Sequence, residues 1–136
     1  MVVTSKYKFL AHPADIKINA YGASLSEVFS NAALGMMAYV YGKKQVKVDK
    51  YEQIEIDGAD TEQLLISWLA KILALSSINQ RSYVSFNIKE ISSQRLVAEL
   101  GSGKARAVNE IKAVTYSELS LKQLKNGWVA TVVYDI

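Results

Sequence analysis

Residues 24–42 read SLSEVFSNAALGMMAYVYG, and this stretch predicts an amphipathic helix with a signal at each end. Ser24 and Glu27 form a capping-box pattern, in which the serine hydroxyl and the glutamate carboxylate each accept a backbone N–H at the helix start. Gly42 is typical of the residue that ends a helix. Between them the apolar residues recur at helical spacing: Leu25, Val28, Phe29, Ala32, Ala33, Met36, Met37 and Val40.

A second helix is predicted further along the chain, with Asp60 or Thr61 as its N-cap. Glu62 follows in the first turn, where the positive end of the helix dipole favours an acidic side chain. The apolar residues of this segment occupy one wide face, so we expect the helix to lie against the core. The polar residues 76–82 are expected to turn the chain.

The other segments alternate apolar and polar residues, which is typical of half-buried strands. The expected strands are 7–10, 16–21, 45–49, 51–57, 83–91, 95–100, 111–121 and 128–136. Residues 125–127, KNG, provide a hairpin turn between the last two strands, and residues 101–104, GSGK, are expected to form a flexible hairpin loop. The sequence therefore predicts an α+β fold: a single domain over residues 1–136, with two helices packed on a mostly antiparallel β-sheet.

Composition excludes several classes of site. The 136 residues contain no cysteine and one histidine, which excludes disulfides, thiolate metal sites, thiol catalysis and any site that needs two imidazoles. The net charge of +3 is too small for a dedicated nucleic-acid binder, so we expect no strong direct binding of nucleic acid. The most apolar run, 64–78, is shorter than the ~20 residues of a membrane span. We expect a cytoplasmic protein without a membrane segment.

Two motifs that suggest chemistry are weak. The sequence at 101–104 resembles part of a phosphate-binding P-loop, but Ala98 stands where that pattern needs glycine and Ala105 where it needs serine or threonine. His12 is the only candidate for a general base, and a lone imidazole beside a proline is more often a packing or hydrogen-bonding residue.

The carboxyl-terminal strand is more informative. It places two carboxylates next to each other, the side chain of Asp135 and the main-chain carboxylate of Ile136. A third acidic group such as Asp15, in the loop after the first strand, would complete a cluster of oxygen ligands suited to calcium or magnesium. From spacing alone, a solvated Asp135 and a terminus paired with a lysine is the more common arrangement.

Three motifs together resemble the archease family. Residues 9–16, FLAHPADI, are similar to a signature near the family's start, usually His-Thr-Ala-Asp, with Pro13 in place of threonine. Residues 111–116, IKAVTY, resemble its Lys-Ala-Val-Thr-Tyr motif, and residues 128–136, WVATVVYDI, resemble its ending. The order of the elements also fits, so the resemblance spans nearly the whole chain.

The resemblance implies a helper protein that is not itself an enzyme. In this family the protein activates the tRNA-splicing RNA ligase: it promotes formation of the ligase–guanylate intermediate, allows multiple turnover and broadens the use of nucleoside triphosphates. The family's metal ligands map onto Asp15, Asp135 and the carboxylate of Ile136. Calcium is the implied ion, with magnesium or another hard divalent cation as the alternative.

Other positions of the resemblance concern the partner. The possible contacts with the ligase are His12, Lys112, Thr115 and Tyr116. The chain departs from the family at Ser117, where histidine is common, and at Ala70 and Lys71, where asparagine and glutamate are usual. These departures concern partner contacts and leave the three metal ligands unaffected.

Three alternative functions stay open at this point. One is a chaperone that binds a tRNA methyltransferase and modulates its choice of site. Another is a small hydrolase that uses a metal ion between Asp15 and Asp135 to activate water, although the chain offers no good general base besides His12. The third is a structural or nucleic-acid-binding module, whose RNA affinity would be weak and strongly dependent on salt.

Overall fold

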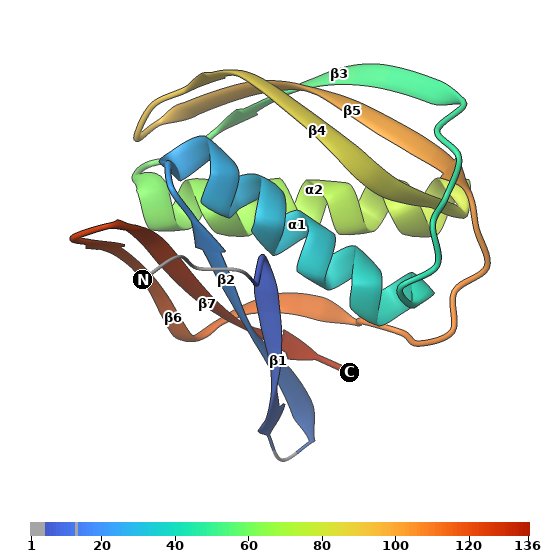
Figure 1. Ribbon diagram of the computed structural model, residues 1–136, viewed down its shortest axis with the longest axis horizontal. Helices are drawn as coiled ribbons and strands as arrows, with labels where there is room; N and C mark the ends of the chain where they lie inside the picture. Colours follow the sequence, from blue (N-terminus) through green and yellow to red (C-terminus); the bar gives the residue numbers. More distant parts are fainter. Residues whose placement is uncertain (1–4, 13) are drawn as a thin grey trace.

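The structure is a computed structural model that describes residues 5–12 and 14–136, with the backbone alone for residues 11 and 12. Two helices lie between two groups of strands (Figure 1). The elements in chain order are β1 (Tyr7–His12), β2 (Asp15–Gly22), α1 (Leu25–Tyr41), β3 (Lys50–Asp57), α2 (Thr61–Asn79), β4 (Arg81–Ile91), β5 (Arg95–Lys104), β6 (Ala113–Leu124) and β7 (Gly127–Asp135).

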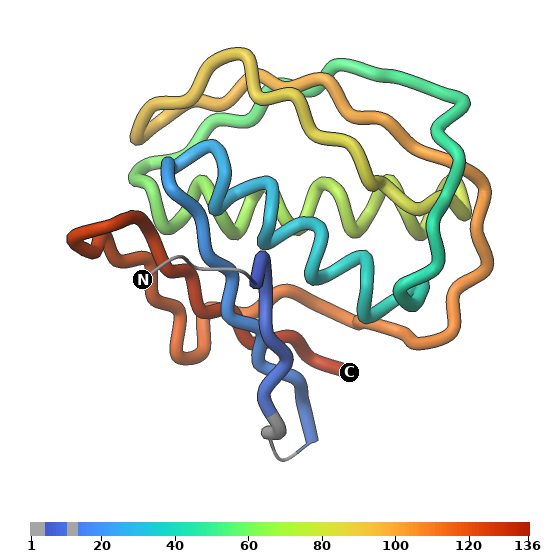
Figure 2. The backbone as a smooth tube through the Cα atoms, viewed as in Figure 1, coloured from blue at the N-terminus to red at the C-terminus, as the bar shows by residue number. Residues whose placement is uncertain are grey.

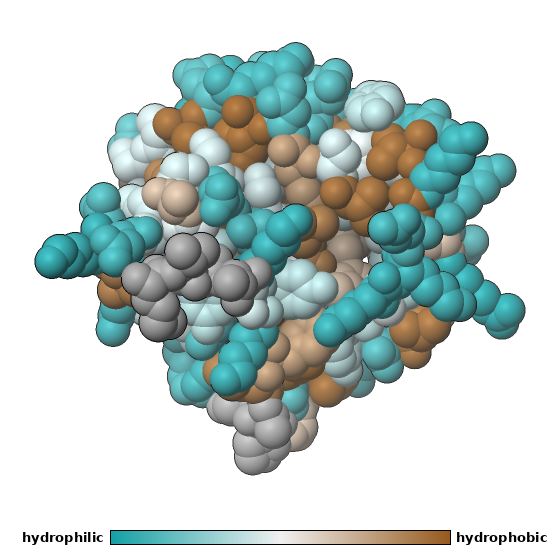
Figure 3. Space-filling view, viewed as in Figure 1, coloured by the Kyte–Doolittle hydropathy of each residue, from teal (hydrophilic) through white to brown (hydrophobic). Residues whose placement is uncertain are grey.

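The strands form two antiparallel sheets. One has the strand order β1-β2-β7-β6 and the other β3-β5-β4. The predicted α+β fold with two helices is confirmed, while the single sheet that we expected is divided into two, one on each side of the helix pair (Figure 1). Each sheet therefore covers one side of the helices with its apolar face and turns its other face outward. Hydrophilic side chains gather over the three-stranded sheet at the top of the view in Figure 3.

One apolar core joins both helices to both sheets. Trp68 of α2 lies at its centre and is fully buried. The indole N–H of Trp68 donates to the carbonyl oxygen of Phe29 in α1 at 2.9 Å, and its ring meets that of Phe86 in β4 edge to face, with centroids 5.8 Å apart. Because its N–H has a partner, this large side chain can be buried at the junction of three elements without an unsatisfied donor.

The predicted first helix is confirmed, including both of its ends. The hydroxyl of Ser24 accepts the N–H of Glu27 at 3.1 Å, and the carboxylate of Glu27 accepts the N–H of Ala23 at 3.0 Å, one residue earlier than in the usual capping box. Gly42 has a φ of +79° and donates its N–H to Ala38, so the residue that ends the helix adopts a conformation that favours glycine.

The second helix begins as predicted and ends later than predicted. Asp60 is its N-cap, and Gln63 accepts the N–H of Ala59 in a second capping contact that we did not predict. The predicted turn at 76–82 is wrong, because the helix continues to Asn79 and only Gln80, in the left-handed region at φ +54°, separates it from β4. Neither α2 nor any other helix among the described residues is long and apolar enough to cross a membrane.

Residues 101–104 do not form a loop, and residues 45–49 do not form a strand. Instead, 101–104 are the end of β5, and the irregular segment 45–49 runs beside them, with the N–H of Asp49 donating to the carbonyl of Ser102 at 3.0 Å. A Cβ atom at Gly103 would collide with the carbonyl oxygen of Lys47. The glycines thus allow a close crossing of two backbones, and the antiparallel strand is also incompatible with a P-loop.

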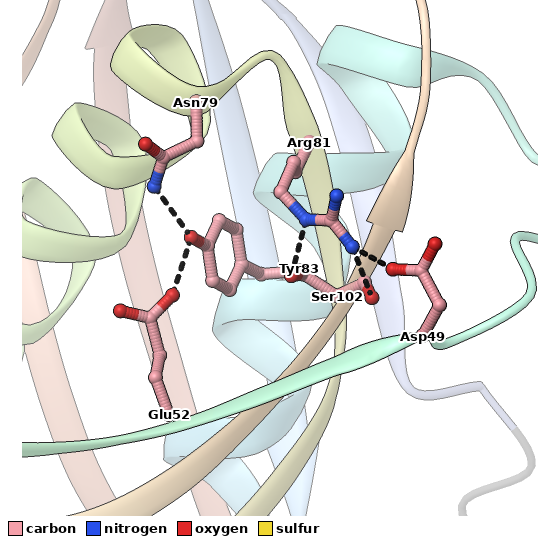
Figure 4. Close-up of polar contacts among 6 residues, drawn as sticks. All are labelled: Asp49, Glu52, Asn79, Arg81, Tyr83 and Ser102. Atoms are coloured by element: carbon pink, nitrogen blue, oxygen red, sulfur yellow. Dashed lines mark hydrogen bonds and ion pairs between the residues drawn. The ribbon is translucent and has the colours of Figure 1, made fainter.

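A buried arginine stabilises the contact between the end of β5 and the segment 45–49 (Figure 4). The side chain of Arg81, at the start of β4, donates to the hydroxyl of Ser102 at 2.9 Å and to its carbonyl at 3.1 Å. The same guanidinium pairs with Asp49. Three segments that are distant in sequence are held together by this one group.

A buried tyrosine makes a second polar link close by. The hydroxyl of Tyr83 donates to the carboxylate of Glu52 in β3 at 2.7 Å and accepts from the amide of Asn79 at 3.0 Å (Figure 4). Burial, together with the bond to Glu52, raises the pKa of Tyr83 above its ordinary value. The end of α2 is thereby tied to both edge strands of the three-stranded sheet.

Candidate functional site

The register of the four-stranded sheet brings two of the three predicted metal ligands, Asp15 and Asp135, together. Asp15, the first residue of β2, is the direct partner of Asp135, the last residue of β7. Directly opposed residues of an antiparallel pair project from the same face with Cβ atoms about 4.5–5.5 Å apart. Two carboxylates from opposite ends of the sequence are therefore neighbours at one end of this sheet.

Strand alternation explains why both carboxylates face away from the core. The next register pair along the same two strands is Ile16 with Tyr134, and Tyr134 is 1% exposed within the apolar core. Because successive side chains of a strand point to opposite faces, Asp15 and Asp135 lie on the outer face. Asp135 is exposed and Asp15 is half-buried.

The atoms of Asp15 and Asp135 that could bind a metal ion are all carboxylate oxygens. Two like charges directly opposite each other destabilise a strand pair, and a cation between them would remove this cost. Among the described residues, no three His, Asp or Glu side chains are grouped so that they could hold a metal ion. The resemblance assigns a third donor, the main-chain carboxylate of Ile136, and three carboxylates have the chemistry that a hard cation such as calcium prefers.

Lys112 and Thr115 form hydrogen bonds with the backbone of β7 beside these carboxylates. The N–H of Lys112 donates to the carbonyl oxygen of Asp135 at 2.7 Å, which holds the last residue of β7 in place, while the Lys112 side chain is exposed. The hydroxyl of Thr115 donates to the carbonyl of Val133 at 2.8 Å and accepts the N–H of Ser117 at 3.2 Å. Both residues fix the geometry of the β6–β7 pair next to the carboxylates.

The predicted strand 111–121 is interrupted by a wide bulge. Thr115 pairs with Val133 and Ser120 with Thr131, so residues 116–119 stand opposite Val132 alone. In Figure 2 the orange-red tube of β6 loops out of the line of the strand here. Nothing in the local sequence, which lacks glycine and proline, signals this excursion.

The bulge has two notable side chains. Tyr116 is 60% exposed, which makes its ring available to a partner. Glu118 adopts a φ of +54°, and its carboxylate accepts a hydrogen bond from the ammonium of Lys17 in β2 at 3.0 Å. We did not predict the pair of Lys17 and Glu118, although alternation from Asp15 already places Lys17 on the same face of the sheet.

The remaining predicted contact residues are only partly described. His12 is the backbone register partner of Asp15 at the end of β1, and its side chain lies outside the described part of the structure. Pro13 is also outside the described residues. Ala70 and Lys71, which depart from the pattern that the resemblance suggests, are both exposed on α2.

Comparison with known proteins identifies the relatives of this chain. The Archease protein family (MTH1598/TM1083) matches residues 7–136. The protein archease of Methanosarcina mazei is 36% identical over 140 residues, which cover 96% of each chain. Protein archease of a Saccharolobus islandicus strain is 35% identical over 136 residues, covering 96% of this chain and 98% of its relative.

Two solved structures share the fold. The solution structure of protein 1598 from Methanobacterium thermoautotrophicum has a TM-score of 0.77 and 27% identity, covering 96% of this chain and 99% of the other. The crystal structure of an archease, described as a possible chaperone, from Thermotoga maritima has a TM-score of 0.67 and 21% identity, covering 95% and 96%. With its motifs, its fold and nearly its full length matched, the chain belongs to the archease family.

Proposed function

We propose that this protein activates the tRNA-splicing RNA ligase and is not itself an enzyme. In this role it promotes guanylylation of the ligase, allows many turnovers and broadens the choice of nucleoside triphosphate. One observation carries the proposal. In a chain of the archease family, the two aspartates that the resemblance assigns to a metal site are direct register partners at the end of an outward-facing sheet surface.

The proposed metal ligands are Asp15, Asp135 and the carboxylate of Ile136. Their chemistry fits Ca²⁺, or Mg²⁺ or another hard divalent cation, because all donors are carboxylate oxygens. A bound cation would supply positive charge that an acceptor on the partner, such as a phosphate oxygen, can bind. The continuous β2–β7 ladder, from Asp15 with Asp135 to Gly22 with Trp128, keeps the ligands in fixed positions.

The surface around the carboxylates is the proposed contact with the ligase. Tyr116 projects from the bulge as an exposed aromatic side chain, and Lys112 adds an exposed ammonium. We include His12 in this surface because it lies in the register row of Asp15 and Asp135, and Thr115 because it lies two rows further along the sheet. The proposed partner is a protein, so the contact does not require the strongly basic surface of a nucleic-acid binder, and the net charge of +3 is compatible with it. We propose that activation takes place in the cytoplasm.

Activation follows one of two routes. The carboxylates could present an ion to the nucleotide site of the ligase, or the protein could bind a nucleotide-competent conformer of the ligase more tightly than other conformers. Only a difference in affinity between two conformers can shift their populations. Calcium-free protein that still activates the ligase would favour the second route.

The experiment is ligation of RNA with a cyclic-phosphate end by the splicing ligase of the same organism, at large substrate excess. We expect many turnovers only when this protein is present. The variants Asp15→Asn and Asp135→Asn should bind calcium at least tenfold more weakly and activate less, because each removes one anionic ligand. Asp57→Asn, which changes an acidic residue of the other sheet, is the matched control and should activate fully.

The result also separates the alternatives. The relative from Thermotoga maritima is described as a possible chaperone. If a competent ligase gains no turnover, the proposal fails, and an effect on tRNA methylation would favour the chaperone role instead. Phosphatase or nuclease activity that requires Asp15 and Asp135 would favour a metal-dependent hydrolase.

A further inference from the structure

A cavity of about 710 Å³ lies where the ends of both helices meet the connector between β5 and β6. In Figure 1 both helices end at the right of the view, where the orange connector passes them. The cavity volume is within the ~300–1,000 Å³ that is typical of small-molecule sites. Its buried lining residues are Val40, Tyr41, Ser76 and Ile111.

The walls of this cavity are held by hydrogen bonds. The N–H groups of Val108 and Asn109 both donate to the carbonyl of Val40, at 2.7 and 3.1 Å, and the amide of Asn109 donates to the carbonyl of Tyr39 at 3.0 Å. On the floor, the hydroxyls of Tyr41 and Ser76 are 2.6 Å apart and hydrogen-bonded to each other. The cavity is thus preformed, and carbonyl groups at the end of α1 are already occupied by donors of the connector.

The rim of the cavity is rich in donors and carries net positive charge. Arg106 and Lys112 line it together with a single acidic residue, Glu110. Within the described part of the chain, the side chains of Arg106 and Lys112 have no hydrogen bond or ion pair, and neither helix has a basic residue in its last turn. Two cationic side chains are therefore available above a floor that combines apolar side chains with the paired hydroxyls of Tyr41 and Ser76.

We propose that this cavity binds a small organic anion. Its apolar or aromatic body would lie on Val40, Leu73 and Ile111, and its phosphate or carboxylate group would bind Arg106 and Lys112. Arginine and lysine donate charge-assisted hydrogen bonds to either kind of oxyanion. Lys112 belongs both to this cavity and to the proposed contact with the ligase, because its N–H is bonded to Asp135. Binding of the anion is therefore tested without the ligase, so that failure of either proposal can be recognised separately.

The test uses the isolated protein and three probes: phenyl phosphate, benzoate and neutral benzamide. Dissociation constants are measured from amide chemical shifts, which also locate the probe. We expect at least one anion to bind with shifts concentrated in residues 105–112 and the last turns of both helices. Binding of phenyl phosphate alone would identify the group as a phosphate, and binding of benzoate alone would identify it as a carboxylate.

The matched variants separate binding from structure. Arg106→Ala combined with Lys112→Ala should weaken the anion at least tenfold, while Lys43→Ala combined with Lys44→Ala, which removes two exposed lysines outside the lining, should leave affinity unchanged. If Arg106 and Lys112 only stabilised the helix ends, their loss would lower stability and leave probe affinity the same. That outcome, equal binding of benzamide, or no binding of either anion would overturn the proposal.

Discussion

At the scale of single residues, Tyr134 makes stability decline in alkaline solution. Burial raises the pKa of this tyrosine far above its ordinary value of 10.0. The unfolded chain loses the phenolic proton near pH 10 while the folded chain keeps it, so the contribution of Tyr134 is complete below pH 10 and decreases above it. The decrease is at most about 1.4 kcal/mol per pH unit. We expect Tyr134→Phe to flatten this decline in urea unfolding, and Tyr51→Phe, at a 61% exposed position, to leave it unchanged.

Arg81 provides a second prediction at the same scale. Its buried guanidinium bonds twice to Ser102, whereas its partner Asp49 has a side chain that is 54% exposed. We expect Arg81→Met to lower the free energy of unfolding by about 2 kcal/mol, because hydrogen bonds to a charged group are lost. Asp49→Asn should cost less than about 1 kcal/mol, since water solvates an exposed carboxylate. Equal losses in urea unfolding would contradict this assignment.

At the scale of elements, the sequence predicts what local interactions determine. Both ends of the first helix can be predicted, because Ser24 with Glu27 and Gly42 each act on backbone groups only a few residues away. The end of the second helix was missed, because Ser76 looks like a turn residue until the hydroxyl of Tyr41 is placed beside it. Residues 101–104 were likewise expected to form a loop, because a glycine-rich segment usually does. Gly103 is needed in this strand because a distant segment crosses it closely, which the local sequence does not reveal.

The candidate site follows the same division. Alternation along β2 places Asp15 on one face with Lys17 and Asn19, while β7 has valine at two of the positions that alternate with Asp135. In neither strand does periodicity determine which residue opposes which residue of the other strand. The family resemblance assigned both aspartates to a metal site, and the register places them opposite each other. The bulge at 116–119 has no sequence signal, because it is defined by pairing of β6 with β7.

The end of α2 provides a prediction for an element. Gln80 follows the helix in the left-handed region at φ +54°, where side chains other than glycine are strained. We expect Gln80→Gly to raise the free energy of unfolding by about 0.5–1 kcal/mol, because relief of this strain exceeds the entropic cost of glycine. Gln80→Ala keeps the strain and should give no gain, which urea unfolding of the two variants would show.

At the scale of the whole molecule, the proposed cation joins β2 and β7, the two central strands of the four-stranded sheet. Asp15 lies near the beginning of the chain and Asp135 near its end, so a ligand held by both binds the folded state and has no equivalent site in the unfolded chain. A cation at a hundred times its dissociation constant should therefore stabilise the fold by about 2.7 kcal/mol. Thermal unfolding with calcium and with a chelator measures this difference.

The variants of the carboxylate pair make this prediction specific. Asp15→Asn is compared with the parent chain both in calcium and in a chelator, so that the effect of the substitution on the ion-free protein is subtracted. With calcium, it should lose the stabilisation that the parent chain gains. Extension of the chain by one glycine after Ile136 moves the main-chain carboxylate and should weaken calcium without altering either aspartate. A calcium-dependent shift that persists in both variants would place the ion elsewhere on the molecule, and the carboxylates would then have to act in activation without a metal.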